Sequence, residues 1–525
     1  MKNKIYGLFL IFALLLSAIL PSAVLPIKKT GTETLPSYAA ATEFGQAFST
    51  VLDCQDAPVR LLLSSDTAPD SYGAAVEASG YGGLYFYGYS SESIAAVAYD
   101  AYSLDAAVKW VVYDSFGGES SSDGDGMFYA FEGDVITEAA TEGQTSFLSW
   151  GANAMGVPSY LSYLEKTYGT SSLNEVVVAV IDSGINTNHP LLKNRIADGG
   201  VSFASASDTP AYQDDNGHGS HVSGIIADLT LSNVKILPIK IINSDGFVSF
   251  SAIAAALTYV AELKAEGVNI VAANMSFSGP TELTSAFYAI YSSLINSLYA
   301  GGVVSVAAAG NNSADAVAYS PANIEKALTV SSVGLNSSGS YVIASNSNYG
   351  AMIDLAAPGV NIYSAYLGAA GYTTLSGTSM AAPHVTAAVA LLRSLPSNSD
   401  MSSEEVEFCM KQVDAMDIGT ATKYGYGLVH LSLAAPAASE QGAGSASEKN
   451  NGVLASVDES GESSTANDND DNVIGGYLND GSVPDAYDLD QARRKQIILI
   501  FVISVASVSL VGIVVSAILR RRKRL

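Results

Sequence analysis

Four polar residues occupy chemically useful places in stretches that are otherwise small or apolar. Asp182 ends an apolar run and begins a Ser-Gly turn, and His218 lies between two glycines. Asn311 follows a second apolar run and a glycine, and Ser379 opens an alanine-rich stretch after a small-residue turn. A serine becomes nucleophilic only beside a base, and the base needs an acid to orient it. Acid, base, amide and hydroxyl are the groups that acyl transfer requires.

Each of these residues alone has a plainer interpretation. Asp182 and Asn311 are typical turn residues, and a serine near the start of a core helix is common. The chain has five histidines, and His221 follows His218 by three positions, which suggests a metal pair. No glutamate follows His218, so the His-Glu-x-x-His pattern of metalloproteases is absent. We therefore interpret His221 and His384 as structural.

Alternating apolar segments must position these groups. The hydrophobic pattern predicts strands near 176–181, 234–242, 268–274, 302–308 and 327–333, and helices at 253–265, 283–298 and 379–395. Apolar strands that alternate with helices predict an α/β fold, with a parallel sheet covered by helices on both faces. In such sheets ligands gather at the carboxyl ends of strands, where Asp182 and Asn311 would lie. Ser379 would open a helix, whose free N–H groups favour developing negative charge.

Taken together, the motifs resemble those of the subtilisin family of serine peptidases. The matching segments are 181–185, 217–224, 274–276, 309–311 and 377–384. The resemblance implies that Asp182 orients His218 and that His218 takes the proton of Ser379. It also implies that Asn311 and the backbone N–H of Ser379 stabilise an oxyanion, and that no cofactor is required. A non-catalytic binding module would need a missing member of this set, and none is missing.

The same resemblance implies a groove that binds a peptide or protein substrate as an added strand. The wall of the first specificity pocket would be Ser276, Phe277, Ser278 and Gly279, and the opposing edge would be Gly246, Phe247 and Val248. Family members commonly have glycine where Ser278 stands, so a bulkier wall is expected. Ala318 or Tyr319 would lie near the floor of the pocket.

A calcium site of the family is expected to be missing. Many members use an aspartate soon after the first motif and a loop that interrupts the histidine helix. Here Leu191 replaces the aspartate, and residues 225–234 leave no room for the loop. No metal-ligating residue is predicted, and calcium at another, unidentified site stays open.

Composition indicates an exported protein. The 525 residues include 51 acidic and 25 basic ones, a net charge of −26, which argues against nucleic acid as a partner. Residues 1–23 resemble a signal peptide, with a basic start and a short apolar run. The two cysteines, Cys54 and Cys409, allow no disulfide framework and have no zinc-type spacing.

Residues 45–115 predict a small α+β domain before the catalytic domain. Strands are expected at 59–63, 84–87 and 108–113, with a helix at 91–102. The layout resembles the inhibitory pro-domain of the family, so the protein's own pro-domain is an expected partner. Residues 116–148 are acidic and rich in serine and glycine, which is typical of a cleavable linker.

The predicted catalytic domain, 149–436, is followed by an acidic spacer at 437–496. Residues 497–519 carry no charge and are long enough to span a bilayer, and the basic tail 520–525 follows at once. Basic residues behind the span place the C-terminus in the cytoplasm. We expect a single-pass protein of the cell membrane whose catalytic domain is extracellular. A dedicated processing peptidase for one exported precursor is the alternative to a broader endopeptidase.

Overall fold

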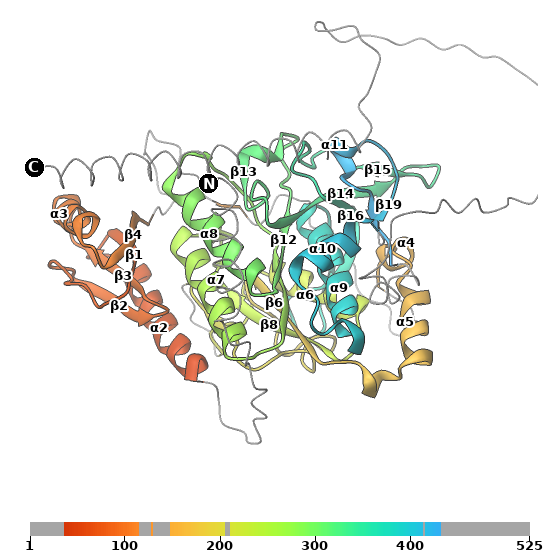
Figure 1. Cartoon of the computed structure of the whole chain (residues 1–525), viewed down its shortest axis with the longest axis horizontal. Coiled ribbons are helices and arrows are strands. Elements are labelled where there is room, and N and C mark those ends of the chain that lie inside the picture. Colours follow the sequence, from red (N-terminus) through yellow and green to blue (C-terminus); the bar gives the residue numbers. More distant parts are fainter. Residues whose placement is uncertain (1–35, 115–127, 130–147, 205–209, 413–414, 432–525) are drawn as a thin grey trace, which may run out of the picture.

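The computed structural model describes residues 36–114, 128–129, 148–204, 210–412 and 415–431 (Figure 1). The predicted signal peptide, spacer, membrane helix and basic tail lie outside the described residues, as does most of the linker. No helix in the described ranges is long and apolar enough to cross a bilayer.

A mostly parallel sheet forms the centre of the larger unit. Its strands are β6 (Val176–Asp182), β7 (Val201–Ser202), β8 (Val234–Lys240), β10 (Ile270–Met275), β12 (Val304–Ala308), β14 (Ala327–Leu335), β15 (Tyr341–Ile343), β16 (Leu355–Pro358), β19 (Ala415–Met416) and β20 (Leu428–Val429). They run in the order β19-β20-β16-β14-β12-β10-β6-β8-β7, and β15 pairs with β14. Pairing is parallel from β8 through β6, β10, β12 and β14 to β16. The predicted parallel sheet is therefore confirmed.

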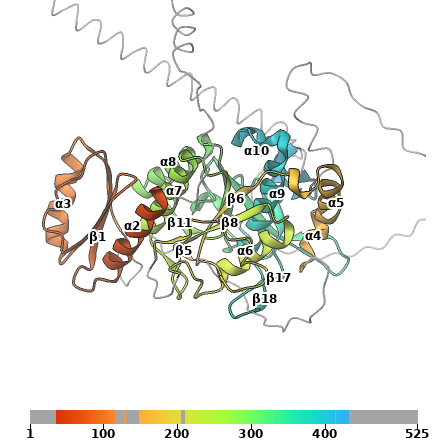
Figure 2. The same cartoon turned by 90° about the horizontal axis from the view of Figure 1, so that it is seen from below.

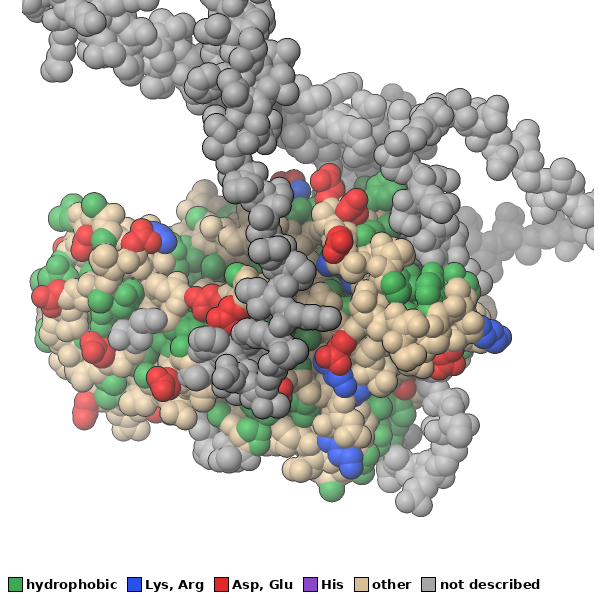
Figure 3. All heavy atoms as spheres, turned by 60° about the horizontal axis from the view of Figure 1, so that its bottom comes forward, with side chains coloured by type: hydrophobic (Ala, Val, Ile, Leu, Met, Phe, Trp, Pro, Cys, Tyr) green, Lys and Arg blue, Asp and Glu red, His purple; other side chains and the backbone are tan. Residues whose placement is uncertain are grey.

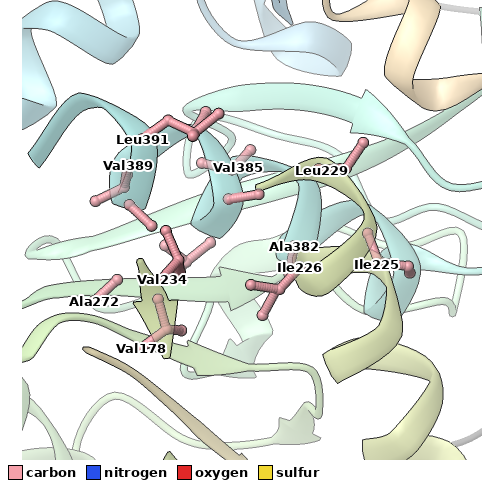
Figure 4. Close-up of a cluster of buried hydrophobic side chains, with 14 of the residues drawn as sticks. Val178, Ile225, Ile226, Leu229, Val234, Ala272, Ala382, Val385, Val389 and Leu391 are labelled. Atoms are coloured by element: carbon pink, nitrogen blue, oxygen red, sulfur yellow. The ribbon is translucent and has the colours of Figure 1, made fainter. Parts of the chain in front are cut away.

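Helices cover both faces of this sheet, as predicted. The main ones are α6 (His218–Leu229), α7 (Phe250–Ala265), α8 (Ala286–Ala300) and α9 (Thr378–Ser394). Val178 and Val180 of β6 belong to one core cluster with α6 and α9, part of which is shown in Figure 4. Ala179 and Ile181, which point to the other face, belong to a second cluster with α7 and α8. Strand β6 thus lies between two helical layers.

Shorter elements complete the unit. Two-stranded ribbons are formed by β5 (Phe128–Tyr129) with β9 (Phe247–Val248), β11 (Gly279–Pro280) with β13 (Tyr319–Ser320), and β17 (Ile362–Ala365) with β18 (Tyr372–Leu375). The remaining helices are α4 (Gly151–Ala154), α5 (Val157–Thr167), α10 (Ser403–Gln412) and α11 (Ala421–Tyr424), with short 3-10 turns at 170–172, 316–318 and 396–398.

Acidic side chains are spread over the face shown in Figure 3, with few basic ones among them.

The N-terminal unit is an antiparallel sheet with one helix on each face. Its elements are α2 (Pro36–Asp53), β1 (Val59–Ser65), β2 (Val76–Tyr81), β3 (Leu84–Tyr89), α3 (Glu92–Leu104) and β4 (Val108–Tyr113), and the strand order is β2-β3-β1-β4. Leu61 and Leu63 pack under α3, whereas Leu62 faces α2. The sequence did not predict α2, which begins ahead of the expected boundary at 45, or β2.

Helix α2 lies between the small sheet and the catalytic unit (Figure 2). The ring of Phe48 stacks on Phe86 of β3, with centroids 4.4 Å apart, and meets Phe203 of the catalytic unit edge-on at 6.0 Å. Ser49 Oγ donates a hydrogen bond to the carbonyl of Ala204 at 2.9 Å. The two units therefore share one hydrophobic core cluster.

Candidate active site

Strand β6 ends at Asp182 and helix α6 begins at His218, and these two side chains meet. The Nδ1–H of His218 and Oδ1 of Asp182 are 2.8 Å apart, and both side chains are buried. The backbone N–H of Ser183 donates to the same carboxylate oxygen at 2.7 Å. The acid is thus held facing the ring, and it fixes the tautomer in which Nδ1 carries the proton.

A network of small polar groups holds the start of α6 against the end of β6. Gly219 N–H donates to Ser183 Oγ at 2.8 Å, and Ser183 Oγ donates to Asp214 at 2.8 Å. Asp214 also accepts from the N–H of Gly217 and, in the first turn of α6, from the N–H of Ser220, both at 2.8 Å. Gly219 permits this close approach, because a Cβ there would collide with the carbonyl oxygen of Gly184.

Opposing effects act on the pKa of His218. Burial disfavours the imidazolium and lowers the pKa, but the neighbouring Asp182 and the more distant Asp214 favour it. The negative charges prevail, and the pKa of His218 is raised above its usual value. The ring is therefore a stronger base than a free histidine.

Lys240, which was not predicted from the sequence, binds three segments around the site, which contain Ser183, Asp215 and Ile242. Its fully buried Nζ donates to the carbonyls of Ser183 at 2.8 Å and Ile242 at 2.9 Å. It also pairs with Asp215, in the loop before His218, at 2.6 Å. The signal was present in the sequence, because Lys240 is the one charged residue in the apolar stretch 236–242.

Ser379 is hydrogen-bonded to Ser276, the residue that follows strand β10. Ser276 follows β10, which pairs with β6 through Met275 and Ile181. The hydroxyl of Ser276 donates to the carbonyl of Ser379 at 2.8 Å, and Ser379 Oγ donates to the carbonyl of Ser276 at 3.0 Å. Helix α9 begins at Thr378, so Ser379 stands in its first turn, and α9 packs on α6.

Asn311 lies beside the start of α9. Its Oδ1 accepts hydrogen bonds from the N–H of Thr378 at 2.9 Å and from the hydroxyl of Thr378 at 3.1 Å. Its Nδ2 would lie 3.2 Å from a Cβ at Gly377, where φ is +152°. The side-chain oxygen of Asn311 is thus held by Thr378, and the Nδ2 group faces Gly377, in the turn before Ser379. This geometry suits a group that donates to an oxyanion.

Residues of both expected substrate edges form short strands, β9 and β11. Phe247 and Val248 form β9, with Gly246 in the preceding turn, and the side chain of Phe247 is exposed. Strand β5 pairs with β9 in antiparallel register and also contacts β11. A segment of the chain, residues 128–129, therefore already lies as an added strand between these edges.

The four residues expected to form the pocket wall, 276–279, have different surroundings in the structure. Phe277 is buried in the core, so its side chain lines no pocket, and Ser276 holds Ser379. Ser278 lies near the end of β12, since a Cβ at Gly310 would be 2.9 Å from its Oγ. Gly279 pairs with Ser320 in the β11–β13 ribbon, which also contains Tyr319.

The other two histidines of these motifs are buried and bound to carbonyl groups. His221 Nε2 lies 3.0 Å from the carbonyl oxygen of Ile362, and His384 Nδ1 lies 2.8 Å from that of Met380. Burial lowers the pKa of His221 to about 3 and that of His384 to about 4. Both rings are neutral at physiological pH, in keeping with structural roles.

The described residues do not fit the calcium site that many subtilisins carry. Helix α6 runs without interruption to Leu229, and β8 begins at Val234, which leaves only a short turn between them. No group of three or more acidic, histidine or cysteine side chains in the described ranges could hold a metal ion. The loss of this one calcium site stays a prediction, and calcium at another site stays open.

Comparisons with known proteins show which family the chain resembles. The model of the Subtilase family matches residues 174–427. Subtilisin BL of Lederbergia lenta is 37% identical over 267 residues, which are 49% of this chain and 90% of that protein. Subtilisin DY of Bacillus licheniformis is 34% identical over 293 residues, 53% of this chain and 97% of that protein. An alkaline protease of Alkalihalobacillus alcalophilus is 37% identical over 267 residues, 49% of this chain and 64% of that protein.

Proposed function

The chain belongs to the subtilase family of serine endopeptidases, and from this we propose that it hydrolyses peptide bonds through Asp182, His218 and Ser379. The observation that carries the assignment is the buried hydrogen bond of 2.8 Å between Asp182 and His218. It lies at the carboxyl end of β6, beside the strand end that seats Ser379. An acid at a strand end, with an oriented base and a hydroxyl at the starts of two helices beside it, supports an acyl-transfer site.

The proposed reaction has two halves. In the first, His218 takes the proton of Ser379 while Ser379 Oγ bonds to the peptide carbonyl carbon, and the protonated ring then gives this proton to the leaving amine. In the second, the oxygen of a water molecule bonds to the acyl carbon while His218 takes a proton from the water. The bond from the acyl carbon to Ser379 Oγ then breaks, His218 returns the proton to Ser379 Oγ, and the acyl group leaves as a carboxylic acid. Asn311 Nδ2 and the N–H of Ser379 stabilise the oxyanion formed in each half.

Ser379→Ala tests this assignment. Cleavage of a fluorogenic peptide by the soluble ectodomain, truncated after Pro436, should vanish in Ser379→Ala. The exposed Ser293→Ala should retain wild-type activity as the matched control. Chelator-sensitive activity that survives Ser379→Ala would contradict a serine mechanism.

We also propose that the N-terminal unit inhibits the enzyme until the linker is cut. Strand β5 occupies the edge β9 where substrate is expected, which supports a linker threaded along the groove. The buried carboxylate of Asp114 accepts from the N–H of Ser251 at 3.1 Å, in the first turn of α7, where a negative charge is favourable. Cleavage in cis between Asp114 and Trp150 should therefore need Ser379, and Ser379→Ala should accumulate the longer chain.

The proposed location is the outer face of the cell membrane, with no cofactor required. The sequence of residues 1–23 and 497–525 supports export and a single membrane anchor. A cysteine placed near Asp470 should react with an impermeant thiol reagent on intact cells. Labelling of that cysteine only after cell lysis would contradict this topology.

A further inference from the structure

Asp228 receives a hydrogen bond from the backbone of Leu148, a few residues ahead of α4. The backbone N–H of Leu148 donates to Asp228 Oδ2 at 3.0 Å. Asp228 stands in the last turn of α6, the helix that begins at His218. Ten residues of helix separate the two, about 15 Å, so Asp228 takes no part in the chemistry.

Within the part of the chain that the structure describes, the carboxylate of Asp228 has no positively charged partner. Burial raises its pKa to about 6, and the hydrogen bond from Leu148 opposes this only in part. Arg195, at the same helix end, binds the carbonyls of Ala227 and Thr230 instead. A negative charge in the last turn of a helix is also unfavourable for its dipole.

We propose that Asp228 is the binding site for the α-amino group of the mature enzyme, which begins at Leu148. This inference rests on the proposed removal of the pro-segment. Hydrolysis of the bond between Phe147 and Leu148 adds water, leaves a carboxylate on Phe147 and frees the nitrogen of Leu148 as an ammonium group. That nitrogen already lies 3.0 Å from Asp228, so the hydrogen bond becomes an ion pair without rearrangement.

Packing explains why trimming would stop at this residue. Trp150 Nε1 donates to the carbonyl of Val360 at 3.0 Å, and Gly151 and Ala152 are buried at the start of α4. A peptidase needs an extended and accessible segment, and the residues after Leu148 are instead held by the fold.

The ion pair can be created independently of self-processing. In the Ser379→Ala ectodomain, residues 143–147 are replaced by Asp-Asp-Asp-Asp-Lys, so that enteropeptidase exposes the amino group of Leu148. The melting temperature is measured before and after cleavage. Asp228→Asn keeps an acceptor for the Leu148 N–H and removes only the charge, and Asp198→Asn, at an exposed aspartate, is the matched control.

After cleavage, Asp228→Asn should melt about 2 to 4 °C below the Asp198→Asn control, whereas before cleavage the two should agree within about 1 °C. Equal melting temperatures after cleavage would overturn the proposal. N-terminal sequencing of the wild-type mature ectodomain should give Leu148, and any other start would also overturn it. A wild-type chain that never cuts itself would instead refute the proposed self-processing, and the enteropeptidase arm would still decide the role of Asp228.

Discussion

Lys240→Met should destabilise the catalytic unit far more than other lysine replacements. Methionine fills the space of the lysine stem but donates no hydrogen bonds. The carbonyls of Ser183 and Ile242 would lose a buried donor, and Asp215, whose side chain is 25% exposed, would lose its cation. Because all three acceptors belong to segments that hold the site, the loss should loosen the ends of β6 and β8 together.

The expected loss of stability in Lys240→Met follows from the buried polar groups that would remain without a partner. Leaving a buried polar group without a partner costs about 1 to 3 kcal/mol, and breaking a buried ion pair by removing one member costs about 3 to 5 kcal/mol. We take about 3 to 5 kcal/mol for the whole replacement, because these effects overlap. At about 2 to 4 °C per kcal/mol, the melting temperature should fall by about 6 to 20 °C.

Thermal unfolding in the Ser379→Ala background, which prevents self-digestion, measures this change. Lys235→Met is the matched control, because Lys235 lies on the same strand and its Nζ makes one exposed hydrogen bond, to the carbonyl of Asn194 at 3.3 Å. The control should shift the melting temperature by no more than about 2 °C. Equal shifts in the two variants would refute the role given to Lys240.

Four further predictions concern the chemistry and its inhibition. Asn311→Ala should lower kcat by about 10² to 10³, the loss known for one oxyanion donor in subtilisin itself, with KM little changed, whereas the exposed Asn312→Ala should change neither. Because the pKa of His218 is raised above 6.5 and only the neutral ring accepts a proton, kcat/KM should rise with pH through a midpoint above 6.5. Asp182→Asn should lower that midpoint and reduce kcat by about 10⁴. Asp114→Ala should weaken inhibition by the cleaved pro-segment about fivefold to tenfold, measured as its inhibition constant, because α7 loses a buried cap.

The sequence predicted the parallel sheet because its strands are apolar throughout and its helices are periodic. The strand predicted at 108–113 is β4 with the same bounds, and the helix predicted at 253–265 is α7, begun at Phe250 by the cap Ser249. The strand predicted at 234–242 ends at Lys240, where the chain turns to bring Lys240 Nζ to the carbonyl of Ile242.

Other features could not be predicted from local pattern. Helix α2 is rich in alanine and serine, and its burial depends on Phe203, which is distant in the sequence. Phe277 was expected in the pocket wall because of the family resemblance, but its side chain is buried in the core. The roles of Ser276 and Asp228 depend on partners more than 75 residues away, Ser379 at a separation of 103 and Leu148 at 80. Spacing within one motif carries no information on such contacts.

The most direct test of the account is the site of covalent modification by a fluorophosphonate. Its phosphorus is attacked by an activated serine and loses fluoride, and the adduct adds a fixed mass to one peptide. Peptide mass mapping of the processed ectodomain should find the adduct on Ser379, with labelling strongly slowed in His218→Ala because the base is gone. An adduct on another serine, or labelling of His218→Ala at the wild-type rate, would contradict the proposed site.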